Sequence, residues 1–321
     1  MERYSPLPLL PTEGTSAYII PAGSGGKSKH EKINYVCLLT IKELYRHYLI
    51  QLQSIYDLSE STIITDKVFE KIAGFKRTDM VRQIAGKVPP AIAVQLKDNL
   101  TQLLDHRPLQ YVLGETWFYH LKFKVNEQVL IPRPETEELV ELFLLDPRSK
   151  MPGISILDIG TGSGCIPISI RKNRPQANLT AIEISKAALE VAEENALNHL
   201  TTVDFRQLDF LNEKEWKELP LFDIVISNPP YIPFHEKEKI ARNVEAYEPH
   251  LALFVPDNNP LLFYEKIASF SKTHLTRKGK IYLETHQDLA KDVAAIFNIK
   301  FADVVVKKDL SGKERMVIVA T

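Results

Sequence analysis

An apolar run that ends in a glycine-rich loop constrains the fold of this chain more than any other feature. Residues 154–159 have the pattern of a buried strand, and the loop Asp158-Ile-Gly-Thr-Gly-Ser-Gly164 leads from it into a helix. Beyond Gly153 strands and helices alternate, which is typical of a doubly wound parallel sheet. We therefore predict an α/β domain with a mostly parallel, seven-stranded sheet.

The elements of this domain are predicted from apolar runs and from the breaks between them. Strands are expected at 154–159, 179–183, 203–207, 222–227, 280–284, 301–306 and 315–320. Helices are expected at 163–173, 186–198, 259–275 and 286–296. Residues 232–257 follow neither period, and a loop of that length in a compact domain is usually a lid or a binding loop.

The glycine loop lies where open α/β sheets bind their ligands. Its spacing is G-x-G-x-G, whereas a nicotinamide site has G-x-G-x-x-G, and the carboxylate of Asp158 would repel a pyrophosphate. A carboxylate at that place suits an ammonium or sulfonium group. The alternative is a turn that only packs the helix on the strand. The candidate cofactor-binding residues of the loop are Asp158, Gly160, Thr161, Gly162, Ser163 and Gly164.

Two further candidates follow the next two strands. Glu183 ends the second strand, 25 residues after Asp158, where an acid can bind the hydroxyls of a ribose. Asp209 and Phe210 follow the third strand and offer an acceptor and an aromatic ring to adenine. Each is weak by itself, because an acid at a strand end is often solvated surface. Together with the glycine loop they predict a nucleoside site at one edge of the sheet.

The fourth strand is expected to end at Asn228-Pro229-Pro230-Tyr231. Proline has no N–H to continue a ladder, and the residue before it is held extended. The side-chain oxygen of Asn228 and the carbonyl of Pro229 can then face one space beside the ring of Tyr231. Two neutral acceptors fit a planar –NH2, either a carboxamide or an exocyclic base amine. The alternative is a turn that only ends the strand.

The N-terminal part has a different composition. Residues 1–33 are predicted to be a flexible extension, because they cannot bury enough apolar surface to order themselves. Residues 34–106 follow a helical period and predict a small bundle of four helices, the third beginning after Thr78 and ending at Gly86. Lys and Arg number 40 in the chain against 41 Asp and Glu, so neither nucleic acid nor a membrane is an expected partner. The bundle suits recognition of a protein.

Residues 107–150 are predicted to connect the bundle with the α/β domain at 151–321. A short β-hairpin is expected, with alternating apolar residues from Tyr119 to Val125, a break at Asn126 and a second run at 129–131. A helix then opens at the Pro132-Arg-Pro134 segment.

The other reactive side chains are expected to be structural. Cys37 and Cys165 are the only cysteines, which excludes a disulfide framework and favours a reducing cytoplasm. The histidines form no metal-spaced pair, so no metal is expected. The chain has neither a signal-peptide pattern nor an apolar stretch of membrane-spanning length. Glu284 at the end of the fifth strand is either a solvated acid or a supporting group, and whether it or Arg133 touches a substrate stays open.

These pieces resemble a known family. The glycine loop, Glu183 and Asn228-Pro-Pro-Tyr231 look like the fold of class I methyltransferases that use S-adenosylmethionine. More narrowly, the chain is similar to the HemK-like release-factor glutamine N5-methyltransferases, over about residues 34–321. The motifs that carry this likeness are Gln110-Tyr-Val-Leu-Gly114, Leu130-Ile-Pro-Arg-Pro-Glu-Thr-Glu137, Tyr247-Glu-Pro249 with Ala252-Leu253, and Asp309-Leu-Ser-Gly-Lys-Glu-Arg315. Glu183 stands where the family usually has Asp, and Phe210 where a tryptophan is frequent.

The resemblance implies an activity and a partner. The enzyme would methylate the glutamine of the Gly-Gly-Gln motif of peptide chain release factors, with Asn228, Pro229, Pro230 and Tyr231 at the reacting amide. The cofactor would be S-adenosylmethionine, with Asn228 also among the residues that bind it, and its product S-adenosylhomocysteine. The helical domain would grip the release factor, and a monomer is expected. The alternatives are a methyltransferase for a ribosomal-protein glutamine, a nucleic-acid adenine N6-methyltransferase, and a non-catalytic binding module.

Overall fold

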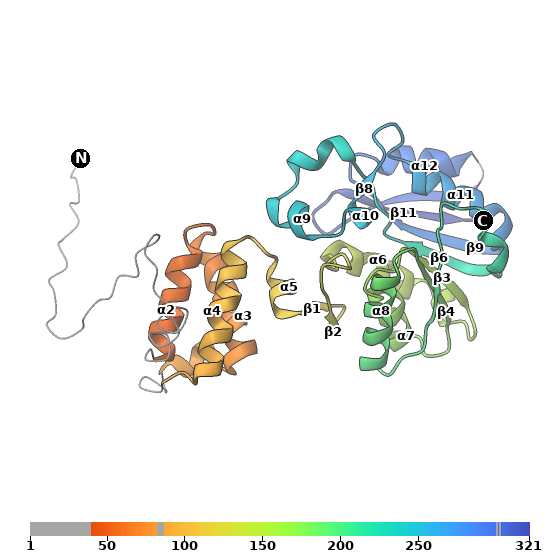
Figure 1. The fold of residues 1–321 in the computed structure, drawn as a ribbon. Coiled ribbons are helices and arrows are strands. Elements are labelled where there is room, and N and C mark those ends of the chain that lie inside the picture. Colours follow the sequence, from red (N-terminus) through yellow and green to blue (C-terminus); the bar gives the residue numbers. More distant parts are fainter. Residues whose placement is uncertain (1–39, 82–86, 300, 302) are drawn as a thin grey trace, which may run out of the picture.

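The structure is a computed structural model that describes residues 40–81, 87–299, 301 and 303–321. A small group of helices is followed by a larger α/β domain, with a β-hairpin between them (Figure 1). The predicted extension at 1–33 lies outside the described residues, as does Cys37. None of the helices in the described ranges is long and apolar enough to cross a membrane.

The N-terminal helices form a bundle with its own core. They are α2 (Ile41–Leu52), α3 (Leu58–Ala73) and α4 (Pro90–Leu104), with the short α5 (Leu109–Leu113) after them. Helix α2 begins with a capping box between Thr40 and Glu43, and α3 ends at Gly74 in the left-handed conformation. Tyr48 and Phe69 are fully buried in the core and meet edge to face at 5.3 Å. Of the predicted third helix the structure has a 3-10 turn, η1 (Arg77–Val81); residues 82–86 lie outside the described part.

The β-hairpin forms, but its position differs from the prediction. Its strands are β1 (Glu115–Phe118) and β2 (Leu121–Lys124), so the turn lies at Tyr119 and His120. Both turn residues have positive φ, 46° and 63°. Two-residue hairpin turns of this kind usually contain Asn or Gly. The turn at Asn126 was therefore a wrong prediction, because Tyr-His carries no turn signature.

The central sheet has seven strands in the order β10-β11-β9-β6-β3-β4-β5. Strands β3, β4, β5, β6 and β9 are parallel, and β11 pairs antiparallel with β9 and β10. This confirms the predicted fold. The strand bounds are β3 Ser155–Ile159, β4 Asn178–Glu183, β5 Asp204–Gln207, β6 Phe222–Ser227, β9 Leu275–Glu284, β10 Asp303–Lys308 and β11 Glu314–Ala320.

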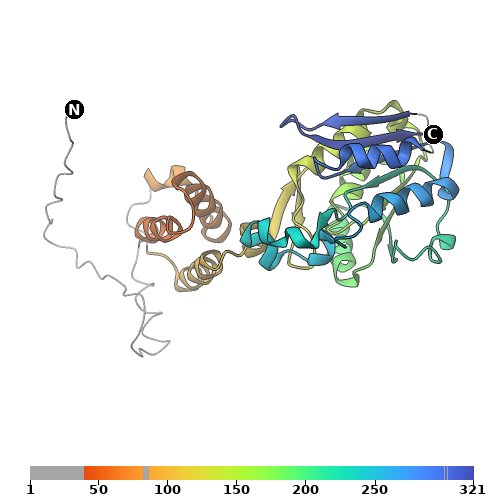
Figure 2. The ribbon, with the colours of Figure 1, turned by 90° about the horizontal axis from the view of Figure 1, so that it is seen from above.

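Helices cover both faces of the sheet (Figures 1 and 2). They are α6 (Pro134–Leu145), α7 (Cys165–Asn173), α8 (Lys186–Asn198), α11 (Leu262–His274) and α12 (Ala290–Asn298). Alternate residues of β3 feed two separate cores: Ile156 packs with α6 and α7, whereas Leu157 packs with α11 and α12. Phe118 and Phe123 of the hairpin belong to the first of these cores. The predicted connector is thus built into the α/β domain.

The segment after Tyr231 is not the irregular loop that we predicted. It contains β7 (Ile232–Pro233), η4 (Phe234–Lys239), α9 (Arg242–Tyr247), α10 (His250–Leu253) and β8 (Phe254–Val255). These elements are too short to leave a periodic signal in the sequence. Strand β7 pairs with β8, which closes the segment at its base.

Candidate active site

The predicted site residues meet at one edge of the sheet. Strand β3 pairs in parallel with both β4 and β6, so Ile159 lies opposite Ile182 and Ser227. The loops that follow these three strands therefore leave the sheet side by side. The chain turns to opposite sides of β3 at this edge, and open α/β sheets bind ligands at such a switch point.

The glycine loop has a backbone that only glycine adopts freely. Gly160, Gly162 and Gly164 have φ of +73°, +54° and +77°. A Cβ on Gly160 or Gly162 would meet nothing within 4 Å, so a ligand can approach the backbone there. A Cβ on Gly164 would lie 3.0 Å from Ile168 and 3.2 Å from Ala192 of α8. The third glycine therefore serves the packing of α7 and α8.

Buried polar atoms collect beneath this loop. Both carboxylate oxygens of Asp158 and the hydroxyls of Thr161 and Ser163 are buried and find no hydrogen-bond partner among the described residues. Burial raises the pKa of Asp158 to about 7, against a smaller opposing effect of the neighbouring Thr161 hydroxyl and with a further upward effect of Glu183. A buried polar atom without a partner costs about 1–3 kcal/mol. The loop therefore fits a ligand that brings positive charge and hydrogen-bond donors.

Glu183 lies against the glycine loop. Its Oε2 accepts a hydrogen bond from the N–H of Gly162 at 3.1 Å, and its Oε1 accepts one from Ser185 at 3.1 Å. The carboxylate is partly exposed, so it keeps lone pairs for ligand hydroxyls. Glu183 thus lies beside the glycine loop, and its role toward a ribose stays a prediction.

The ring of Phe210 does not face the site as expected. It is 5% exposed, stacks on Trp216 with centroids 5.4 Å apart, and meets Phe270 edge to face. Phe210 packs into the core formed with Trp216 and Phe270. The sequence did not reveal that Trp216 would complete this core. Asp209 stays half-buried and accepts from the N–H of Leu211 at 3.0 Å. In this arrangement Asp209, and not the ring, stays partly exposed.

Asn228 lies at the end of β6 and is fixed by a contact that the sequence did not predict. Its Nδ2 donates to Oγ1 of Thr136 at 3.0 Å, and that hydroxyl donates to Oε2 of Glu284 at 2.7 Å. Thr136 is in the first turn of α6 and Glu284 ends β9, so three elements meet here. The proline-rich segment before α6 was recognised from the sequence without a role for Thr136. Glu284 is a buried supporting group and not a solvated acid.

The two prolines and Tyr231 lie beside Asn228. Pro229 is buried and Pro230 half-buried. Tyr231 packs against the core with its ring 6.0 Å from the ring of His286, and burial raises its pKa to about 12. It therefore stays a neutral phenol near pH 7. Of the four residues, Asn228, Pro230 and Tyr231 stay partly exposed at the end of the strand.

An ion pair fastens the segment that follows. Oε1 of Glu248 pairs with a guanidinium nitrogen of Arg133 at 2.6 Å, and its Oε2 accepts from the N–H of Ile131 at 3.1 Å. The Glu248 side chain is 1% exposed. The Arg133 guanidinium is thus engaged in an ion pair within the protein. Arg133 directly precedes the first turn of α6, which contains Thr136. This contact holds the segment 232–255 against the start of α6.

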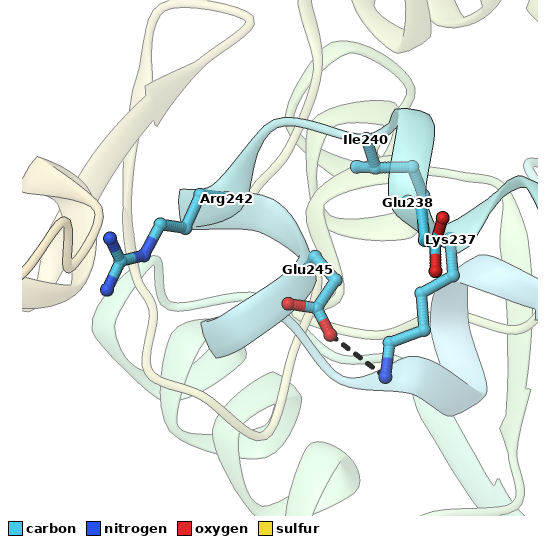
Figure 3. A pocket seen from close by; sticks show the side chains of 5 residues that line it. All are labelled: Lys237, Glu238, Ile240, Arg242 and Glu245. Atoms are coloured by element: carbon cyan, nitrogen blue, oxygen red, sulfur yellow. Dashed lines mark ion pairs between the residues drawn. The ribbon is translucent and has the colours of Figure 1, made fainter.

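A separate hollow lies on the surface of this segment (Figure 3). Its lining alternates in charge, with Lys237 and Arg242 against Glu238 and Glu245, and Lys237 is paired with Glu245 at 2.9 Å. Lys237 and Glu245 thus neutralise each other, and Arg242 points away from both acids (Figure 3). The hollow does not include Asn228 or the glycine loop.

Cys165 is a packed hydrophobe, as expected. It is 8% exposed at the start of α7, and burial raises the pKa of its thiol to about 12. Within the described ranges no three side chains of His, Cys, Asp or Glu gather as a metal site would require.

The fold and this site define a methyltransferase of the doubly wound α/β class. Residues 140–247 match the family model of the methyltransferase small domain. The chain belongs to the release factor glutamine methyltransferase family. It is 40% identical over 282 residues to the release factor glutamine methyltransferase of Flavobacterium psychrophilum, covering 87% of this chain and 98% of the relative.

Other relatives carry the same description. The release factor glutamine methyltransferase of Lactococcus lactis is 46% identical over 220 residues, covering 68% of this chain and 79% of the relative. Among solved structures, the release-factor-specific protein-(glutamine-N5) methyltransferase of Alicyclobacillus acidocaldarius is 29% identical, with a TM-score of 0.39, over 62% of this chain and 98% of that one.

Proposed function

We propose that the protein transfers the methyl group of S-adenosylmethionine to the side-chain amide nitrogen of the glutamine in the Gly-Gly-Gln motif of peptide chain release factors. The observation that carries the proposal is the arrangement of Asn228. Its Nδ2 donates a hydrogen bond to Oγ1 of Thr136, and no group among the described residues donates a hydrogen bond to its Oδ1. A neutral acceptor at that place fits an N–H of a planar carboxamide. Membership of the family supports the substrate class.

Methyl transfer to a carboxamide nitrogen depends more on how the nitrogen is positioned than on a catalytic base. The lone pair of a carboxamide nitrogen is delocalised, so the nitrogen attacks only when it is held in line with the methyl group. In this proposal Oδ1 of Asn228 and the carbonyl oxygen of Pro229 each accept a hydrogen bond from one N–H group of the glutamine amide. The ring of Tyr231 lies against the plane of that amide. Asn228 is neutral and removes no proton. The glutamine nitrogen would bond to the methyl carbon as the carbon–sulfur bond breaks, which leaves S-adenosylhomocysteine, and the N-protonated amide would then lose a proton to water.

The cofactor is assigned to the glycine loop. When bound, S-adenosylmethionine supplies an electrophilic methyl group on a positively charged sulfur. Asp158 supplies negative charge beneath the loop, Gly160 and Gly162 allow close approach, and Glu183 binds the ribose. The buried oxygens without partners support this assignment. Their donors would come from the ligand and from ordered water.

Removing the Glu183 carboxylate tests the ribose assignment. We expect Glu183→Ala to weaken S-adenosylhomocysteine binding by about 1–3 kcal/mol, because polar contacts are left unmade. Isothermal titration calorimetry measures it. Glu190→Ala, on the exposed side of α8, is the matched control and should bind as the wild type does. Equal affinity in the two variants would remove Glu183 from the site.

The substrate itself is tested with labelled S-adenosylmethionine. The enzyme is incubated separately with a release factor, with ribosomes and with DNA, and a release factor lacking the motif glutamine is the control. We expect label only in the intact release factor, recovered as N5-methylglutamine after digestion. Label in a ribosomal protein or in adenine would replace the proposal with one of the alternatives considered above.

We also propose that the helical bundle, assigned to residues 34–106, docks the release factor. The buried residues of the bundle form a core of their own. Residues 31–106 contain ten Lys or Arg and nine Asp or Glu, and this balance of charge suits binding to a protein better than binding to nucleic acid. Removal of residues 1–105 should raise the KM for release factor about 10-fold or more and leave S-adenosylhomocysteine affinity within about 2-fold, since docking energy is lost while the cofactor site stays. Removal of residues 1–33 is the control. Equal KM values in both truncated forms would place docking elsewhere.

A further inference from the structure

We propose that Thr136 and Glu284 are positioning residues that decide which end of the Asn228 amide faces the substrate, and that protonation of Glu284 reverses this choice. The inference rests on the proposed function and deepens it. It concerns the three side chains that join β6, α6 and β9 at the site.

The ionised state of Glu284 leaves only one arrangement of protons. A carboxylate can only accept, so the single proton of the Thr136 hydroxyl points to Oε2 of Glu284, at 2.7 Å. A lone pair of the same hydroxyl then faces Asn228. Only the NH2 end of an amide can satisfy it, which is the arrangement found, with Nδ2 at 3.0 Å. The acceptor Oδ1 is thereby turned to the substrate.

Burial makes this arrangement selective. Thr136 is 2% exposed and Glu284 is 1% exposed, so bulk water does not compete for either group. An unmade hydrogen bond at such a place costs about 10-fold or more in population, because the desolvation of the group is not recovered. The geometry thus favours one end of the Asn228 amide, and a free asparagine would favour neither.

Protonated Glu284 has the opposite effect. The acid donates its proton to Thr136, the Thr136 proton turns to Asn228, and the amide rotates to offer Oδ1 to Thr136. The NH2 end of Asn228 then faces the substrate. Both it and the N–H groups of the glutamine amide are donors, so no hydrogen bond forms between them. Methyl transfer is present with Glu284 ionised and is lost as the pH falls through its pKa.

The surroundings put this change near neutral pH. Burial raises the pKa of Glu284 to about 7, opposed by the hydrogen bond from Thr136. Other charges around the carboxyl act in both directions: Glu135 raises the pKa, while Arg315 and Arg133 lower it. The remaining titratable groups that face it are Tyr231, Tyr264 and Cys165, all neutral near pH 7 because burial raises each of their pKa values.

Variants of Thr136 separate positioning from packing. Thr136→Val keeps the shape and removes the hydroxyl, and we expect kcat on release factor to fall about 10- to 100-fold, with S-adenosylhomocysteine affinity unchanged. The fall of kcat below pH 7 should disappear as well. Thr136→Ser keeps the hydroxyl and should restore both the rate and the pH profile. Thr65→Val, a buried threonine of α3 bonded to Ser61, is the matched control and should keep both.

Glu284→Gln completes the test. Its amide can either accept from or donate to the Thr136 hydroxyl at every pH, so the orientation of Asn228 is no longer fixed. We therefore expect kcat to fall and to show no step near pH 7. Asp158 titrates in the same range, and kcat is therefore measured at saturating S-adenosylmethionine. Wild-type rate and pH profile in Thr136→Val, or an equal loss in Thr136→Ser, would overturn the inference. A wild-type enzyme that does not methylate release factor would instead overturn the proposed function.

Discussion

We expect Asn228→Ala to lower the kcat for release-factor methylation by about 10²-fold or more, since an acceptor aimed at the reacting nitrogen acts mainly in the transition state. The fold should persist. The side chain lies at a strand end, and its loss removes one hydrogen bond, to Thr136, worth about 1 kcal/mol. Steady-state kinetics and urea denaturation measure the two effects.

Two further variants sharpen this prediction. Asn228→Asp keeps an acceptor, adds a charge that also stabilises the sulfonium ground state, and cannot donate to Thr136 as the amide does. We expect activity between alanine and wild type, with cofactor binding equal or tighter. Asn178→Ala, an exposed asparagine of β4, is the control and should be fully active. Near-wild-type turnover in Asn228→Ala would remove Asn228 from the chemistry.

We expect Asp158→Asn to stabilise the protein without ligand by about 2–4 kcal/mol at pH 8, because a buried charge without partners is removed. The sign follows from the pKa, which is 3.8 in an ordinary aspartate and about 7 here. As the pH rises, the unfolded chain loses the proton near 4 and the folded chain only near 7. The folded state is therefore destabilised progressively between these two pKa values, and the full cost of the charge is reached above pH 7. Each pKa unit of difference between the folded and unfolded chains is worth roughly 1.4 kcal/mol.

With the cofactor on the glycine loop as proposed, the same substitution should weaken S-adenosylmethionine binding about 10-fold or more at pH 8, because the negative charge beneath the loop is lost. Urea denaturation at pH 8 and pH 4 measures stability, and the two proteins should converge at the lower pH. Asp204→Asn, an exposed aspartate of β5, is the matched control. A stability gain that is equal at both pH values would mean that the Asp158 charge is not its source.

The site could be located from the sequence because its parts lie at strand ends. The run 222–227 was predicted with the bounds that β6 has, and Asn228 follows it directly. In a parallel sheet neighbouring strands end at one edge, so the sequence alone led us to expect that Asp158, Glu183 and Asn228 meet there. Local pattern and one rule of topology were enough.

Other features depended on packing between distant segments. Phe210 has the local context of a ligand-stacking ring, yet Trp216 and Phe270 take it into the core. The hairpin turn at Tyr119 and His120 adopts positive φ without a turn residue. The carboxylate of Glu183 supports the loop through the N–H of Gly162, which no sequence spacing predicts.

The sequence by itself determined the doubly wound fold and the side chains at its binding edge, since both depend on apolar periodicity and on residues next to strand ends. The tertiary structure alone decided how Asn228 is held. Thr136 lies 92 positions before it and Glu284 lies 148 positions after Thr136, and hydrogen bonds over such separations form only when the folded sheet brings the segments together. Burial at that meeting point then determines the pKa of Glu284, which no local pattern encodes.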